Sequence, residues 1–100
     1  MQTDVFGNPI RDQELLRRIE KAKLTQRVRN PHVELHDPIE DNARIRPIVR
    51  EVERRAEKES MVAGMGRCHD VWSRMEHILK SEHGIVWYPP SRMNTDLIYD

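Results

Sequence analysis

Three side chains with metal-binding chemistry alternate in a polar stretch of the chain. His32, Glu34 and His36 are spaced two residues apart, and on an extended backbone all three would point to the same side. Imidazole and carboxylate groups are acceptable ligands for zinc and other divalent ions. The spacing matches no specific metal motif, and histidines scattered in a polar stretch are usually surface residues. We therefore predict no metal site and no cofactor.

Cys68 is the only thiol, and it is followed directly by His69. Neighbouring residues on a helix point about 100° apart, so this pair is poorly placed for the hydrogen bond that would activate a thiolate. Cys68 also belongs to a run of apolar residues at helical spacing, which is typical of a core position. The sequence contains no Gly-rich phosphate loop and no GxSxG, CxxC or HExxH motif. We predict that the protein is not an enzyme.

The size and composition of the chain limit its architecture. It has 100 residues, of which 37% are hydrophobic and 34% charged, and this favours one small domain over residues 1–100. The mean hydropathy is −0.81, and no apolar run approaches the ~20 residues of a membrane-spanning helix. The first residues show no basic and apolar signal pattern, so we expect a cytoplasmic protein.

The charges balance overall but alternate in blocks along the chain. Both signs number 17, and the basic blocks are residues 1–30 and 44–58. A non-specific nucleic-acid binder would normally carry a net basic surplus, which is missing here. Two arginine-rich helix faces nevertheless support an alternative function, in which a small regulator or inhibitor binds nucleic acid or a nucleic-acid-processing enzyme. The residues of this alternative are Arg17, Arg18, Lys21, Arg50, Arg54 and Arg55.

Hydrophobic spacing predicts an all-α fold, a small bundle of about three helices over residues 9–29, 47–63 and 67–82. Asn8 and Pro9 resemble a helix start, and Pro31 should end the first helix. Its apolar residues form a loose stripe: Leu15, Leu16, Ile19, Ala22, Leu24 and Val28. Residues 30–46 form a polar connector, in which Asp37 and the following proline indicate a short helical turn.

The second half of the chain carries two helical stripes that do not share a register. Gly64 and Gly66 lie just past the slip, which allows one bent helix or, as we prefer, two helices. Gly84 is expected to end the last helix in the left-handed conformation. Residues 1–8 form an N-terminal arm.

Within the N-terminal arm, Gln2–Phe6 resembles the clamp-binding peptides of bacterial replication proteins, with Val5 where leucine is usual. We prefer the interpretation that Val5 and Phe6 fold back on the first helix.

The last residues, 84–100, are expected to form an extended arm rich in apolar and aromatic side chains. A small bundle can cover such an arm only in part, so we expect it to dock on a partner. The expected partner-binding residues are Trp87, Tyr88, Leu97, Ile98 and Tyr99. The sequence thus favours a non-enzymatic assembly or adaptor component that binds a protein partner or a second copy of itself.

Overall fold

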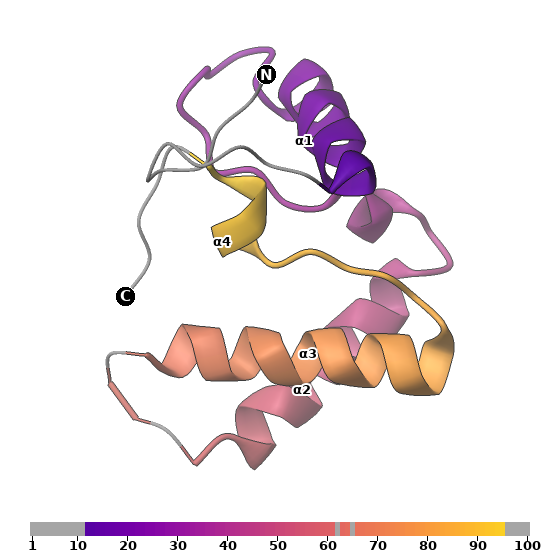
Figure 1. Cartoon of the computed structure of the whole chain (residues 1–100), viewed down its shortest axis with the longest axis vertical. Helices are drawn as coiled ribbons and strands as arrows, with labels where there is room; N and C mark the ends of the chain where they lie inside the picture. The colour runs from indigo at the N-terminus through magenta and orange to yellow at the C-terminus, as the bar shows by residue number, and fades with distance from the viewer. Residues whose placement is uncertain (1–11, 62, 65, 96–100) are drawn as a thin grey trace. The chain divides into compact units, whose positions relative to one another are not determined.

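The computed structural model describes residues 12–61, 63–64 and 66–95. In chain order it contains α1 (Gln13–Gln26), a 3-10 turn η1 (Pro38–Asp41), α2 (Arg46–Glu59), α3 (Arg67–His83) and the short α4 (Pro90–Met93) (Figure 1). Within these ranges no residue is in a β-strand. The predicted all-α class with about three main helices is confirmed. The N-terminal arm and its peptide Gln2–Phe6 lie outside the described residues.

Contacts divide the described chain into two compact units. Unit 1 contains residues 12–38 and 88–95, and unit 2 is the continuous stretch of residues 39–87 between them. Each unit has its own hydrophobic cluster. Trp87 belongs to the cluster of unit 2 and Tyr88 to that of unit 1. The side chains of adjacent non-helical residues point in different directions, so the side chains of Trp87 and Tyr88 pack in different clusters.

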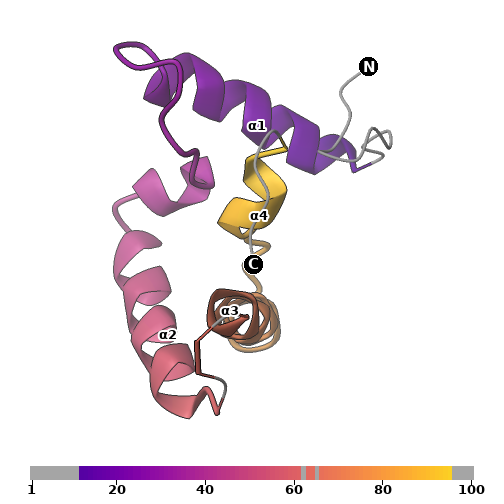
Figure 2. The same cartoon turned by 90° about the vertical axis from the view of Figure 1, so that its left-hand side faces the viewer.

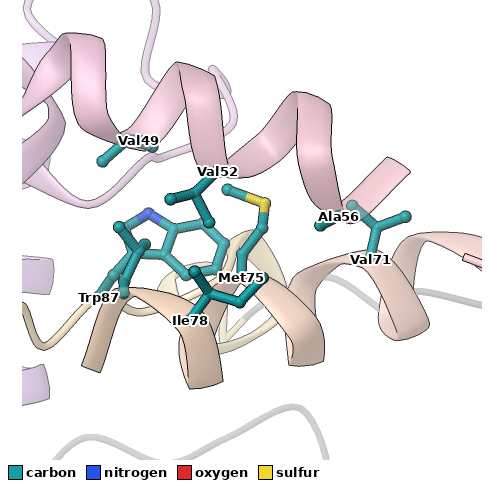
Figure 3. Packing of buried hydrophobic residues seen from close by; sticks show 8 residues of the cluster. Val49, Val52, Ala56, Val71, Met75, Ile78 and Trp87 are labelled. Atoms are coloured by element: carbon teal, nitrogen blue, oxygen red, sulfur yellow. The ribbon is translucent and has the colours of Figure 1, made fainter. Parts of the chain in front are cut away.

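Unit 2 is built on the packing of α2 against α3 (Figure 2). Each helix presents one apolar face, and Figure 3 shows Val52 and Met75 meeting between the two ribbons. The indole of Trp87 lies beside Val52 and Ile78 in the same view. The buried residues of this cluster are Val49, Val52, Ala56, Val71, Met75, Ile78, Leu79 and Trp87.

The two stripes of the second half belong to two separate helices, as preferred from the sequence. α2 ends at Glu59, four residues before the predicted end, because Ser60 is extended and its hydroxyl donates to the Asp70 carboxylate at 2.6 Å. Gly66 then adopts φ +89° immediately before α3, a conformation that favours glycine. Gly84, at φ +65°, ends α3 in the left-handed conformation that the sequence predicts.

In unit 1, α1 is shorter than the predicted helix 9–29. It begins at Gln13, because the carboxylate of Asp12 accepts the Leu15 backbone N–H at 3.1 Å and caps the first turn. It ends at Gln26, whose side-chain amide turns to the backbone of His36. The first proline beyond the helix, Pro31, therefore does not set its end.

The segment 33–37, predicted as part of a polar connector, contributes Leu35 and Asp37 to the interior of unit 1. A non-helical backbone that enters a core must satisfy its N–H and C=O groups. The buried amide of Asn94 accepts the Leu35 N–H at 2.7 Å and donates to the Leu35 C=O at 2.8 Å. Gln26 makes the same pair of bonds to His36, at 2.9 and 2.8 Å. The side-chain amides of Asn94 and Gln26 thus make the backbone hydrogen bonds that a neighbouring strand would make in a sheet.

Within the described part of the expected extended arm 84–100, residues 85–89 are non-helical, but Pro90–Met93 form a short helix. Pro89 keeps an extended conformation, but Pro90 opens α4, where its missing N–H and fixed φ suit a first helical turn. α4 lies beside α1 (Figures 1 and 2) and buries Met93 in the cluster of unit 1. The buried residues of that cluster are Leu15, Ile19, Ala22, Leu35, Tyr88 and Met93.

Replacing Asn94 by alanine should lower the free energy of unfolding by about 2–4 kcal/mol, because it leaves a buried donor and a buried acceptor without partners. Gln26→Ala is the matched control, since Gln26 makes the same two bonds at a half-buried position where water can substitute. It should cost roughly 1 kcal/mol. Urea denaturation measures both values. If both variants lowered the free energy of unfolding by the same amount, burial would not explain the cost of Asn94→Ala.

Candidate partner-binding surface

Trp87, one of the five expected anchors, is part of the core of unit 2. Its side chain is 4% exposed, and its indole N–H donates to the Glu40 carboxylate at 2.9 Å. Tryptophan buried in this way needs a partner for its N–H, and Glu40 supplies one from the same unit. Trp87 is therefore buried within unit 2, and its role in partner binding stays a prediction.

Tyr88, the second expected anchor, is 5% exposed and lies in the core of unit 1. The guanidinium groups of Arg18 and Arg92 each lie over its ring, 5.1 and 5.0 Å from the centroid. Its hydroxyl donates to the Asp12 carboxylate at 3.0 Å. Burial, followed by this contact with Asp12, raises the pKa of the Tyr88 hydroxyl, so it stays a neutral donor. The role of Tyr88 in partner binding likewise stays a prediction.

Arg18, expected in the nucleic-acid alternative, is bound inside unit 1. Its guanidinium donates to the fully buried carboxylate of Asp37 at 2.7 Å and to Glu14 at 3.0 Å. Burial lowers the pKa of Arg18, but the bonds to Asp37 and Glu14 outweigh it, and the pKa is raised overall. Asp37 also accepts the Tyr88 backbone N–H at 2.9 Å. Arg18 is therefore a structural residue and is not free to bind phosphate.

The other cations of the alternative are exposed, and several are already paired. Arg17 contacts Glu14 at 2.9 Å, and Arg54 pairs with Glu51. Arg55 donates to Glu82 and Glu59, and the Glu82 contact is the main reason that the pKa of Arg55 is raised. The two remaining residues, Lys21 on α1 and Arg50 on α2, are exposed. Of the six residues, Arg17, Arg18 and Lys21 belong to unit 1, and Arg50, Arg54 and Arg55 belong to unit 2.

A surface hollow of about 390 Å³ lies within unit 2 between α2 and α3. Its charged residues include Arg55 and Arg74, and Arg74 contacts Asp70 at 3.0 Å. Both guanidiniums are thus held by carboxylates of unit 2, which compete with any anion for them. The lining residues are Arg55, Glu59, Ser73, Arg74, His77, Ile78, Ser81 and Glu82.

The most exposed apolar pair of unit 1 lies at the end of α1, and we missed it in the sequence. Leu24 is 78% exposed and Val28 is 76% exposed, although both were assigned to the stripe of the first helix. For Leu24, the angular position around the helix relative to a core residue predicts this exposure. Leu24 lies nine positions after the buried Leu15, which is half a turn around a helix at 100° per residue, so it faces away from the core.

Cations lie next to this pair in the sequence. Residues 21–33 contain Lys or Arg at four positions and no Asp or Glu. We call the exposed pair and these cations the α1-end patch; its members are Lys21, Lys23, Leu24, Arg27, Val28 and Arg29. Arg27 also donates to the Val33 carbonyl at 3.0 Å, which folds the chain back after the helix.

Leu97, Ile98 and Tyr99, the remaining expected anchors, lie outside the described residues. Within the ranges that the structure covers, no three His, Cys, Asp or Glu side chains are grouped as metal ligands, and the Cys68 thiol is half-buried. No helix in the same ranges is long and apolar enough to cross a bilayer.

Comparison with known proteins gives no match: no family model fits the chain, and neither the curated proteins nor the solved structures contain a significant relative. Its function is therefore inferred from the surface of the chain alone.

Asp37→Asn should lower the free energy of unfolding by about 2–3 kcal/mol, because it keeps the shape of the side chain but leaves the half-buried charge of Arg18 with Glu14 alone. The control is Arg17→Gln, which removes an exposed cation from the same Glu14 and should change stability by no more than about 0.5 kcal/mol. Urea denaturation measures both. A loss in Asp37→Asn as small as the control's would show that the carboxylate charge is dispensable.

Asp12 makes stability depend on acid pH. The Leu15 backbone N–H, with help from the Tyr88 hydroxyl and Arg92, lowers the pKa of Asp12 from its ordinary 3.8. The resulting stabilisation is complete above the ordinary pKa and is lost as the pH falls through the lowered one. Asp12→Asn keeps the cap and removes the titration, so free energies of unfolding measured below pH 5 should fall less steeply with acid in this variant. An unchanged slope would exclude Asp12 as a contributor.

Proposed function

We propose that this chain is a non-enzymatic interaction protein, an assembly or adaptor component that binds a protein partner through the α1-end patch. The observation that carries the proposal is the exposure of Leu24, 78%, in the last turn of α1 and of Val28, 76%, two residues beyond that helix. Single exposed aliphatic residues are common on soluble proteins, but two of them where the chain leaves a helix can form the start of a contact surface.

The position of the patch also supports a binding role. The opposite face of α1 is fixed by Leu15, Ile19 and Ala22 in the cluster of unit 1, so Leu24 projects from a packed helix, and Val28 follows two residues after that helix ends. A contact surface on a rigid helix loses less conformational entropy on binding than a flexible arm does. The proposal thus moves the main contact from the terminal arm to a helix end, and it leaves out the buried Trp87 and Tyr88.

The terminal residues Leu97, Ile98 and Tyr99 remain candidate additional anchors. They follow α4, and α4 belongs to the same unit as the patch. A partner that contacts unit 1 at two places would gain affinity from both. A second copy of the chain is one such partner.

Nucleic-acid binding remains a second candidate because of a regular row of cations on α2. Arg46, Arg50, Arg54 and Lys58 are four residues apart, which places them about 6 Å apart along the helix, and all four are exposed. A row of this kind can follow a phosphate backbone. Glu51 and Glu57 lie on the same helix, however, and Glu51 already pairs with Arg54, which weakens the field of the row.

The double variant Leu24→Gln with Val28→Gln should abolish partner association while leaving the fold intact, because glutamine supports a helix and both side chains are exposed. The chain is measured by light scattering alone and in lysate of its source cells, and any captured protein is purified and titrated back. The double variant should bind it roughly tenfold more weakly or worse.

Met61→Gln is the matched control, since Met61 is 90% exposed and lies in unit 2, away from the patch residues in sequence. This variant should associate like the parent chain. Equal losses in both variants, or a parent chain that stays a lone monomer in lysate, would overturn the proposed function. Loss of the circular-dichroism helix signal in the double variant would show that Leu24 and Val28 have a structural role instead.

A further inference from the structure

The α1-end patch combines two properties that a partner must match together. One is the exposed aliphatic pair, Leu24 and Val28. The other is a local charge of a single sign, because residues 21–33 contain four cations and no carboxylate, with Glu20 just before them. This segment differs from α2, where acids and bases alternate. A complementary surface must offer carboxylates around an apolar centre.

The ordinary explanation for cations at this place is the helix dipole. Cations near the C-terminal end of a helix interact favourably with its unpaired carbonyl groups, and Lys23 lies in the last turn of α1. The dipole accounts for part of the charge. It does not account for two large aliphatic side chains held in water beside that charge, and neither has a place in the hydrophobic clusters.

A nucleic acid fits only one of the two properties. Phosphates would pair with Lys21, Lys23 and Arg29, and the affinity would come from released counterions. The aliphatic pair would stay in water, because a phosphate backbone offers it no apolar surface. An anionic membrane fits somewhat better, but even a whole myristoyl chain anchors a protein only marginally, and two aliphatic side chains bury much less.

A protein segment with both carboxylates and aliphatic residues fits the two properties at once. Leu24 lies in the last turn of α1, and Val28 lies two residues beyond the end of that helix, so the two exposed side chains form a small apolar centre where the chain leaves α1. A partner helix with its own aliphatic residues at intervals of three and four could pack against this pair. Acidic residues flanking that stripe would then lie near the cations of the patch.

We infer that the α1-end patch binds an acidic amphipathic helix of its partner, with aliphatic residues of that helix covering Leu24 and Val28 and its carboxylates facing Lys21, Lys23 and Arg29. This inference rests on the proposed function and specifies the chemistry of the partner. The charges increase the rate of association and set the register, and the aliphatic contact slows dissociation.

The test uses the full chain and a labelled synthetic helical peptide in which leucines at intervals of three and four are flanked by glutamates. The comparison peptide has the same composition in scrambled order. Fluorescence anisotropy should show that the patterned peptide binds roughly tenfold more tightly than the scrambled one. Added salt should weaken this binding, and the double variant Leu24→Gln with Val28→Gln should lose it roughly tenfold or more.

Charge variants supply the matched comparison. Lys21→Gln with Lys23→Gln should weaken binding and reduce its dependence on salt. Arg50→Gln with Arg54→Gln removes two exposed cations from α2 and should leave binding unchanged. Each of these variants keeps the circular-dichroism helix signal, since all four side chains are exposed.

Other outcomes would overturn the inference and identify the alternative. Equal binding of the scrambled peptide or of a DNA oligonucleotide, insensitive to the Leu24 and Val28 changes, would indicate simple charge attraction. Binding to phosphatidylglycerol vesicles, but not to the peptide, would indicate a lipid surface. Self-association that the double variant abolishes would indicate a second copy. The patterned peptide could fail to bind while the double variant still loses association with a partner from the lysate. This result would refute the acidic helix as the partner and would leave the proposed function in place.

Discussion

The buried carboxylate of Asp37 is the interaction on which unit 1 depends. It joins Arg18 of α1 to the backbone of Tyr88, which lies 51 residues further along the chain. Removing a carboxylate from water costs several kcal/mol unless cations and N–H groups replace the lost hydration. Arg18 and Tyr88 provide both, and this requirement fixes where the returning segment must enter the unit. The amide of Asn94 then secures the neighbouring Leu35 in the same way.

This polar interior changes the role of the aromatic residues. Aromatic side chains next to prolines on a short tail look like docking anchors, yet the chain uses them internally. Tyr88 is held by two guanidiniums and a carboxylate, and Trp87 is held by Glu40. Because these contacts satisfy the polar ends of both rings, their apolar bodies can stay in the two clusters. The surface left for recognition is therefore charged and aliphatic.

Sequence reasoning predicts the helices of this protein better than its interior. α3 is placed within one residue, because its stripe is regular and Gly84 marks its end. The start of α1 is misplaced because Asn8 and Pro9 resemble a cap as well as Asp12 does. Side-chain hydrogen bonds decide both the end of α1 and the course of segment 33–37, and no periodic pattern encodes them.

The candidate surface was predictable in part. The sequence predicts that Lys21 lies on a basic helix face. The sequence spacing also places Leu24 on the side of the helix opposite Leu15. The loose stripe of the first helix includes Leu24 and Val28 because apolar type alone does not distinguish the buried face of a helix from the opposite face. Burial of Trp87 and Tyr88 could not be predicted, because it depends on partners 47 and 51 residues away.

The connectivity of the two units has a consequence for how the chain folds. Unit 1 needs residues 88–95 to complete its core, and these emerge from the ribosome after all of unit 2. Within unit 2, the bond between Glu40 and Trp87 holds the two ends of that unit together. A folded unit 2 therefore brings Pro38 and Tyr88, which flank it, into proximity before unit 1 closes. The long loop that unit 1 would otherwise have to close is replaced by a short one, so its closure costs less entropy.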